Sequence, residues 1–135
     1  MESRTAQDAQ DFLSRFDDSR YPTEFTDRYE AMECLSSGQY GETLLGREKA
    51  GGRLLVAKCY EKGHHLFQST EPEELRRLSH PGLPAFAGDM RGTTIRCVLR
   101  EYVEGKTLWE LNQESPFTAE TVRSVGMELC GILEY

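Results

Sequence analysis

The sequence predicts an α+β fold: a five-stranded antiparallel sheet with one inserted helix, followed by two further helices. Three observations lead to this expectation. Short strand-like runs separated by glycine fill residues 29–102, a helix-like segment interrupts them after the third run, and two helix-like segments follow residue 105. The expected order within the sheet region is therefore β-β-β-α-β-β.

An acidic arm precedes the sheet. Residues 1–28 carry four arginines and seven acidic side chains, a net charge of −3. Proline disfavours helical geometry in the residue before it, so Pro22 ends any helix that starts earlier in the arm. The apolar residues of the arm recur at helical spacing, which predicts one short amphipathic helix: Ala9, Phe12, Leu13 and Phe16.

The first three strands are expected at residues 29–35, 43–48 and 54–60. Gly51 and Gly52 lie between the second and third strands, where paired glycines supply the positive φ of a tight hairpin. Consecutive strands joined by short turns pair in antiparallel fashion. The three runs therefore predict a meander.

The inserted helix is expected at residues 73–78. Pro72 precedes it in the first helical turn, where the missing N–H of a proline costs nothing. Two more strands follow at 85–90 and 94–102, linked by a turn that contains Gly92. They complete the five-stranded sheet.

Two helices are expected after the sheet. The first spans residues 107–113, and the second begins at the N-cap Thr118 and runs to Tyr135. Because no capping signal ends the second helix, the sequence is expected to stop inside a structural element. The second helix carries an apolar stripe: Val122, Val125, Leu129, Ile132 and Leu133.

Composition excludes several functions. The 135 residues include 16 Lys and Arg against 23 Asp and Glu, a net charge of −7, which predicts no binding to nucleic acid or anionic membranes. The longest apolar run, 54–57, is too short to span a membrane, and the polar start argues against a secretory signal. The four cysteines are expected to be small buried hydrophobic residues in a reducing, cytoplasmic environment.

The hairpin between the first two strands is the first candidate for chemistry. Gly38 and Gly41 would let backbone N–H groups approach phosphate oxygens without an intervening Cβ. A Gly-x-x-Gly hairpin is, however, more often a simple turn. His64 and His65, the other notable pair, are expected in a solvated loop rather than at a metal site.

A lysine on the third strand adds to this signal. Lys58 lies seventeen residues beyond Gly41, at the end of a run that alternates toward a core. A lysine there is costly unless it has a charged partner, and Glu71, at the start of the inserted helix, is the candidate. The alternative is that Glu71 is a solvated residue at a helix N-terminus.

The order of glycine hairpin, strand lysine, helix glutamate and strand resembles the N-terminal lobe (N-lobe) of the protein kinases. Residues 71–84 resemble the kinase αC helix and its following loop, in the form common in bacterial Ser/Thr kinases. Residues 98–108 resemble the fifth strand, the hinge and the entry to αD, and residues 118–135 resemble αE. The resemblance covers roughly residues 29–135 and stops before the catalytic loop.

This resemblance implies an ATP site. Gly38 and Gly41 would cover the phosphates, and Lys58 would hold the α- and β-phosphates while pairing with Glu71, the two residues of the catalytic machinery present here. Three side chains would line the adenine: Leu35, Thr43 and Val56. The backbone of the hinge at Glu101 and Val103 would form hydrogen bonds to the adenine edge.

The sequence departs from the kinase pattern at several positions. Ser36 replaces the first glycine of the loop, and Pro72 limits the helix before Glu71, which weakens the expected pair with Lys58. Arg100 falls at the gatekeeper position, where it would compete with Lys58 for Glu71.

Three kinase motifs do not occur in the sequence: His-Arg-Asp, Asp-Phe-Gly and Ala-Pro-Glu. The catalytic base and both Mg²⁺ ligands would therefore lie outside this chain, which has no metal site of its own and is expected to be inactive alone.

The chain is expected to contain three parts: an acidic arm at 1–28, a kinase-like N-lobe at 29–104, and αD and αE of an incomplete C-terminal lobe at 105–135. The resemblance implies the ATP-binding portion of a Ser/Thr protein kinase that, when intact, transfers the γ-phosphoryl of Mg-ATP to protein hydroxyls. The alternative is a naturally short pseudokinase-like module that acts through protein contacts. The stripe on αE predicts a homodimer.

Overall fold

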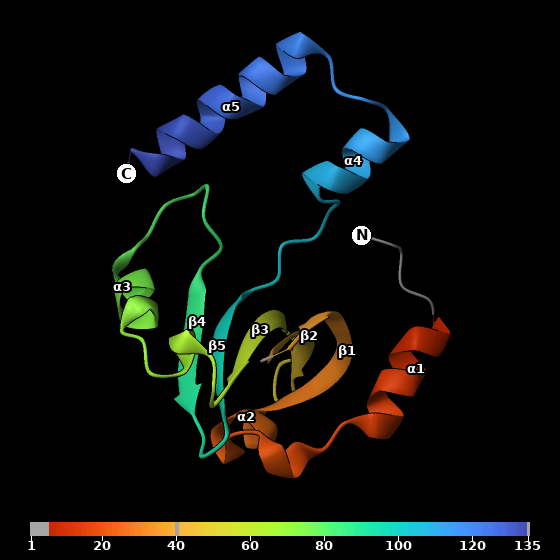
Figure 1. The fold of residues 1–135 in the computed structure, drawn as a ribbon, viewed down its shortest axis with the longest axis vertical. Coiled ribbons are helices and arrows are strands. Elements are labelled where there is room, and N and C mark those ends of the chain that lie inside the picture. Colours follow the sequence, from red (N-terminus) through yellow and green to blue (C-terminus); the bar gives the residue numbers. More distant parts are fainter. Residues whose placement is uncertain (1–5, 40, 135) are drawn as a thin grey trace.

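A computed structural model describes residues 6–39 and 41–134 of the chain (Figure 1). Single turns of 3-10 helix lie at Asp18–Arg20 and His65–Phe67. The strands are β1 (Tyr29–Gly38), β2 (Gly41–Glu48), β3 (Leu54–Glu61), β4 (Phe86–Arg91) and β5 (Ile95–Glu101). The helices are α1 (Ala6–Arg15), α2 (Thr23–Arg28), α3 (Glu71–Arg77), α4 (Leu108–Glu114) and α5 (Ala119–Leu133).

The five strands form one sheet in the order β1-β2-β3-β5-β4, and every neighbouring pair is antiparallel. Helix α3 lies between β3 and β4 in sequence, so the predicted β-β-β-α-β-β order and the α+β fold class are confirmed. Gly52, in the turn between β2 and β3, has a φ of 73°, as the paired glycines predicted.

The sheet has two faces of different character. Residues on one face are buried in the main core, with Leu44, Leu55 and Leu99 at 0% exposure. Because side chains alternate along a strand, Lys58 and Arg100 lie on the opposite face, toward α3. The apolar core and the candidate site thus occupy opposite sides of one sheet.

The N-terminal helices cover the core face. Phe25, on α2, is fully buried and stacks on Tyr29 of β1 with ring centroids 5.7 Å apart. Phe12 of α1 and Phe16, the first residue after α1, are half-buried and pack against the same cluster. The sequence pattern does not reveal α2, because Pro22 reads as an end signal although it occupies the N-cap position of this second helix.

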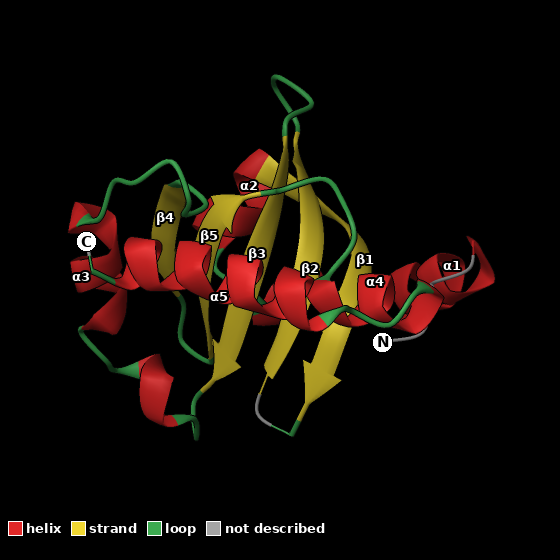
Figure 2. Ribbon diagram, turned by 90° about the horizontal axis from the view of Figure 1, so that it is seen from above, coloured by secondary structure: helices red, strands yellow, loops and turns green. Residues whose placement is uncertain are grey.

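Helices α4 and α5 lie apart from the sheet (Figures 1 and 2). Thr107 begins α4 with a capping box, and the predicted N-cap Thr118 accepts a hydrogen bond from the backbone N–H of Thr121. Ile132 of α5 contacts Gly82 in the loop after α3, where an added Cβ would come within 2.5 Å of its Cδ1 atom. No helix in the described part of the chain is long and apolar enough to cross a membrane.

The cysteines differ in their environments. Cys59 and Cys97 are buried on paired strands with their Sγ atoms 3.4 Å apart, and Cys34 is half-buried. Cys130 is exposed, so the expectation of a buried residue is wrong there, because it lies on α5, a helix without any buried residue. All four thiols are free.

Candidate functional site

Lys58 extends from β3 on the face of the sheet opposite the main core. It is exposed, whereas its neighbours Ala57 and Cys59 are buried. The expectation that the surrounding core makes this lysine costly is therefore wrong: the alternation of the strand turns its side chain out of the core and toward two cavities. Lys58 lines both of them.

The first cavity lies under the glycine hairpin and has a volume of about 340 Å³. Gly38, Gly41, Thr43 and Lys58, four residues predicted to bind the nucleotide, all line it. Thr43 and Lys58 are directly paired across β2 and β3. The sheet therefore brings these four residues together as the sequence predicts.

The two glycines of the hairpin serve different purposes. A Cβ on Gly41 would lie 2.1 Å from the carbonyl oxygen of Cys59, so close packing against β3 already requires a glycine there. Among the described residues, the nearest atom to a Cβ on Gly38 would be the carbonyl oxygen of Gly41, at 3.7 Å. That distance is an ordinary contact, so close packing against the described residues does not require a glycine at this position.

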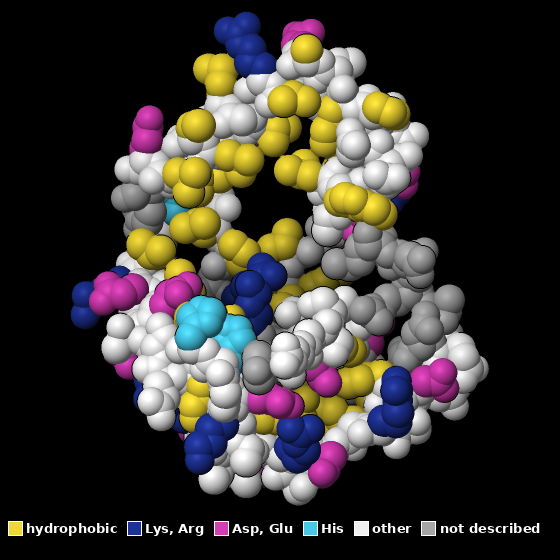
Figure 3. Space-filling view, viewed as in Figure 1, with side chains coloured by type: hydrophobic (Ala, Val, Ile, Leu, Met, Phe, Trp, Pro, Cys, Tyr) yellow, Lys and Arg dark blue, Asp and Glu magenta, His cyan; other side chains and the backbone are white. Residues whose placement is uncertain are grey.

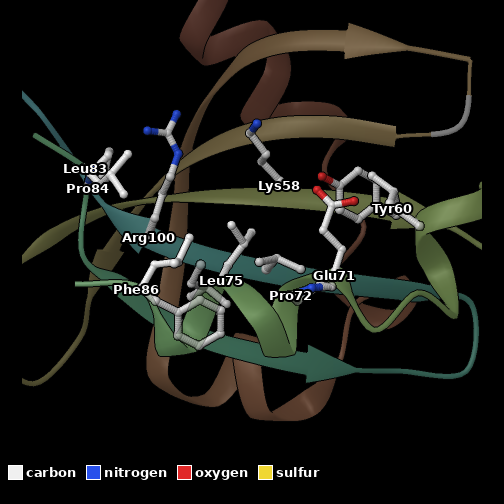
Figure 4. A pocket seen from close by; sticks show the side chains of 13 residues that line it. Lys58, Tyr60, Glu71, Pro72, Leu75, Leu83, Pro84, Phe86 and Arg100 are labelled. Atoms are coloured by element: carbon white, nitrogen blue, oxygen red, sulfur yellow. The ribbon is translucent and has the colours of Figure 1, made fainter. Parts of the chain in front are cut away.

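The second cavity lies between the sheet and α3 and has a volume of about 410 Å³ (Figure 4). Lys58 and Glu71 both line it, but none of the ion pairs found in the described residues joins them. Helix α3 starts at Glu71 and has only seven residues, so this glutamate lies at one end of the cavity. The structure thus places the two predicted catalytic residues in one cavity without the expected contact.

Tyr60 lies at the same end as Glu71 (Figure 4). Burial raises the pKa of the Tyr60 hydroxyl, and the negative charge of Glu71 raises that pKa further. Tyr60 is therefore a neutral hydrogen-bonding group beside Lys58 at neutral pH.

Arg96 of β5 holds the start of α3 in place, and the sequence analysis missed it. Its side chain is fully buried and forms two hydrogen bonds to Asp89 of β4, of 2.8 Å from Nε and 2.6 Å from Nη2. These hydrogen bonds raise the pKa of Arg96, so its charge is fixed. Its Nη1 atom also donates to three backbone carbonyls of the connection before α3, those of Leu66, Phe67 and Ser69.

The contact chain from Arg96 ends at Glu71. Ser69 offers its carbonyl to Arg96, and its hydroxyl accepts a hydrogen bond of 3.0 Å from the backbone N–H of Glu71. The sequence does contain a signal for Arg96, because a charged residue inside the apolar run 95–99 needs a partner, just as Lys58 does on the third strand.

Of the predicted adenine-binding residues, only Thr43 lines one of the two cavities; the remaining four line neither: Leu35, Val56, Glu101 and Val103. Val56 is buried, Leu35 is half-buried and Val103 is 61% exposed. Glu101 is tied to the chain before β4: its N–H donates to the carbonyl of Ala85, and its Oε1 accepts from the Ala85 N–H. The structure thus groups the phosphate-binding candidates with Thr43 but not with the other adenine-binding candidates.

Arg100 lines the second cavity together with Lys58 (Figure 4). Its Nε atom is buried and has no hydrogen-bond partner in the described part of the chain. Within residues 6–39 and 41–134, no group of three or more His, Cys, Asp or Glu side chains could hold a metal ion. Lys58 lines both cavities and Arg100 lines the second, and these cationic side chains suit both cavities to anions.

The curated proteins to which the chain is similar are serine/threonine-protein kinases. The chain is 31% identical over 117 residues to the RAC-beta serine/threonine-protein kinase A of Xenopus laevis, and 31% identical over 114 residues to the human RAC-beta serine/threonine-protein kinase. Each alignment covers 79% of this chain and 24% of the relative, so the chain spans about a quarter of their length. No protein-family model matches the chain.

A solved structure shares the fold. The crystal structure of Rad53 in complex with AMP-PNP aligns with a TM-score of 0.62 at 20% identity, covering 70% of this chain and 26% of that one.

Proposed function

We propose that this chain, whose sheet and helix α3 have the fold of a protein kinase N-lobe, is the ATP-binding portion of a Ser/Thr protein kinase. The similarity to Ser/Thr kinases and the fold confirm the resemblance inferred from the sequence. The intact protein would transfer the γ-phosphoryl of Mg-ATP to Ser or Thr hydroxyls of a protein substrate in the cytoplasm. The free thiols are in keeping with that compartment.

One observation carries the proposal: Gly38, Gly41, Thr43 and Lys58 meet around one cavity. Lys58 offers the positive charge that nucleotide phosphates need, and Gly38 and Gly41 place no Cβ between the hairpin backbone and the cavity that they line. Glu42 lines the same cavity and opposes an anion there. Among the described residues, Lys58 is the one lysine or arginine that lines this cavity, and ATP carries several negative charges. We therefore expect this chain alone to bind ATP weakly.

The roles of this chain's residues are binding and positioning. Lys58 would hold the α- and β-phosphates, and Glu71 would pair with Lys58 after a shift of α3 toward the sheet. Mg²⁺, when bound, would neutralise charge on the phosphates, but its ligands lie outside this sequence, as does the catalytic base. The chain alone therefore transfers no phosphoryl group.

A titration with Mg-ATP followed by amide NMR tests the proposal. We expect shifts at Gly38, Gly41 and Lys58 with a dissociation constant of about 1 mM, and at least a tenfold loss of affinity in Lys58→Met. Lys62→Met, which removes an exposed lysine four residues away, is the matched control and should bind as the parent does. Shifts absent from the hairpin, or equal affinity in Lys58→Met and the parent, would overturn the proposal.

The missing contact between Lys58 and Glu71 favours a second candidate, a pseudokinase-like module that acts through protein contacts. The reading frame beyond Tyr135 separates the two candidates. A continuation into His-x-Asp and then Asp-x-Gly supports the kinase, whereas an immediate stop codon supports the module.

A further inference from the structure

The cavity between the sheet and α3 has the size and lining of a small-molecule site. Its volume of about 410 Å³ lies within the range of about 300–1,000 Å³ that is typical of ligand pockets. Leu75 and Leu78 line it from the α3 side, and Phe86 and Val98 line it from β4 and β5. Most of the lining is apolar.

The charged side chains that line the cavity do not cancel one another. Lys58, Arg100 and Glu71 line it, which leaves one net positive charge. Val56 pairs with Arg100 and Lys58 pairs with Val98, so the two cations are diagonal neighbours on adjacent strands. Such neighbours lie within reach of one another's long side chains. Glu71 lies beyond Lys58, at the end of the cavity away from Arg100 (Figure 4).

Arg100 supplies the observation that points to a ligand. Its Nε–H is buried and has no hydrogen-bond partner among residues 6–39 and 41–134, and a guanidinium can only donate. Neither Arg100 nor Lys58 belongs to an ion pair in that part of the chain. A buried donor without a partner is costly, and an anionic acceptor relieves that cost.

We propose that this cavity binds an organic monocarboxylate with an apolar tail. The carboxylate would accept hydrogen bonds from Arg100 and Lys58, and the tail would pack between α3 and the sheet. A single negative charge matches the net charge of the cavity. Because Lys58 also lines the glycine-hairpin cavity, a bound carboxylate competes with nucleotide phosphates for this lysine, which goes beyond the function proposed above.

A series of ligands that share one tail tests the charge requirement. The full chain is titrated with octanoate, octan-1-ol and octylamine and followed by NMR, without nucleotide. We expect octanoate to bind at least tenfold more tightly than either analogue and to shift the side-chain Nε–H resonance of Arg100. Equal affinity for octanoate and octan-1-ol, an unmoved Arg100 resonance, or shifts confined to α5 would each overturn the proposal.

Variants test the residue. Arg100→Met keeps an unbranched side chain without the guanidinium and should lower octanoate affinity at least tenfold while leaving octan-1-ol binding unchanged. Arg53→Met, in the exposed turn between β2 and β3, removes the same charge elsewhere and should bind octanoate as the parent does. An equal loss in both variants would mean a nonspecific charge effect and would contradict the proposal. Should Arg100→Met fail to fold, Arg100→Lys takes its place, with a weakened but detectable preference for octanoate expected.

Discussion

Gly41 is a residue whose sequence signal and structural role differ. The hairpin motif suggests that a glycine is needed at position 41 to make room for phosphate. In the structure, a glycine is needed there because any Cβ would lie 2.1 Å from the carbonyl oxygen of Cys59 on β3. Close packing against β3 thus requires a glycine at position 41, whereas the nearest described atom to a Cβ on Gly38 would lie at an ordinary contact distance of 3.7 Å. A glycine in a phosphate-loop pattern can thus be required by the sheet itself.

Gly41→Ala should therefore destabilise the chain by about 1–3 kcal/mol, because the new methyl group forces β2 and β3 apart. Gly38→Ala is the matched control and should change the free energy of unfolding by no more than about 0.5 kcal/mol, since the nearest described atom to its Cβ would be the Gly41 carbonyl oxygen at an ordinary contact distance of 3.7 Å. Urea denaturation of both variants measures the difference. Equal costs would contradict this account of Gly41.

At the scale of elements, the connection between β3 and α3 is held by a buried ion pair. Arg96 and Asp89 have 0% and 8% of their side-chain surface exposed, and Arg96 also satisfies three carbonyls of that connection. Burial of charge is tolerated here because all three nitrogens of the guanidinium donate hydrogen bonds, two of them to the opposite charge of Asp89. This pair sets where α3 begins and hence where Glu71 lies.

Arg96→Met should lower the free energy of unfolding by about 3–5 kcal/mol, because it leaves Asp89 buried without its partner. Hydrogen exchange should rise at the amide of Glu71. The control is Arg91→Met, which removes a pair with Glu73 whose side chains are about half exposed, and it should cost less than about 1 kcal/mol. Similar losses in the two variants would show that the buried pair has no special role.

The elements differ in how far the sequence predicts them. Strands β2 and β3 follow from alternation and glycine turns, which are local signals. Helix α2 is not predicted, because Pro22 marks both the end of one helix and the start of another. The missing Lys58–Glu71 contact depends on where α3 lies against the sheet, and that distance is a tertiary property that no local pattern encodes.

At the scale of the whole molecule, apolar side chains remain exposed on the two last helices. Figure 3 shows hydrophobic side chains around the opening between these helices and the sheet. On α5, Val122 is 57% exposed, Leu129 is 48% exposed and Leu133 is 83% exposed. Contiguous exposed apolar surface of this kind favours association.

We expect the chain to self-associate through α5. Sedimentation should give an average mass that rises with concentration, and the double variant Val122→Glu/Leu129→Glu should be monomeric, because charge on the stripe opposes its burial. Arg123→Glu changes the charge of the same helix beside the stripe and should leave the association intact. A monomer at all accessible concentrations of the parent chain would refute this expectation.

The bonds of Arg96 have a consequence for how the sequence can change. The hydrogen bonds that this arginine donates to the connection before α3 go to carbonyl oxygens of the main chain, those of Leu66, Phe67 and Ser69. Every amino acid carries that oxygen, so the arginine holds the path of the chain without regard to the side chains along it. Substitutions at residues 66–68 should therefore leave these hydrogen bonds of Arg96 in place. An insertion or a deletion in this segment should break them, because it shifts the carbonyl oxygens. The hydrogen bonds of Arg96 thus constrain the length of the connection before α3 but not its amino-acid composition.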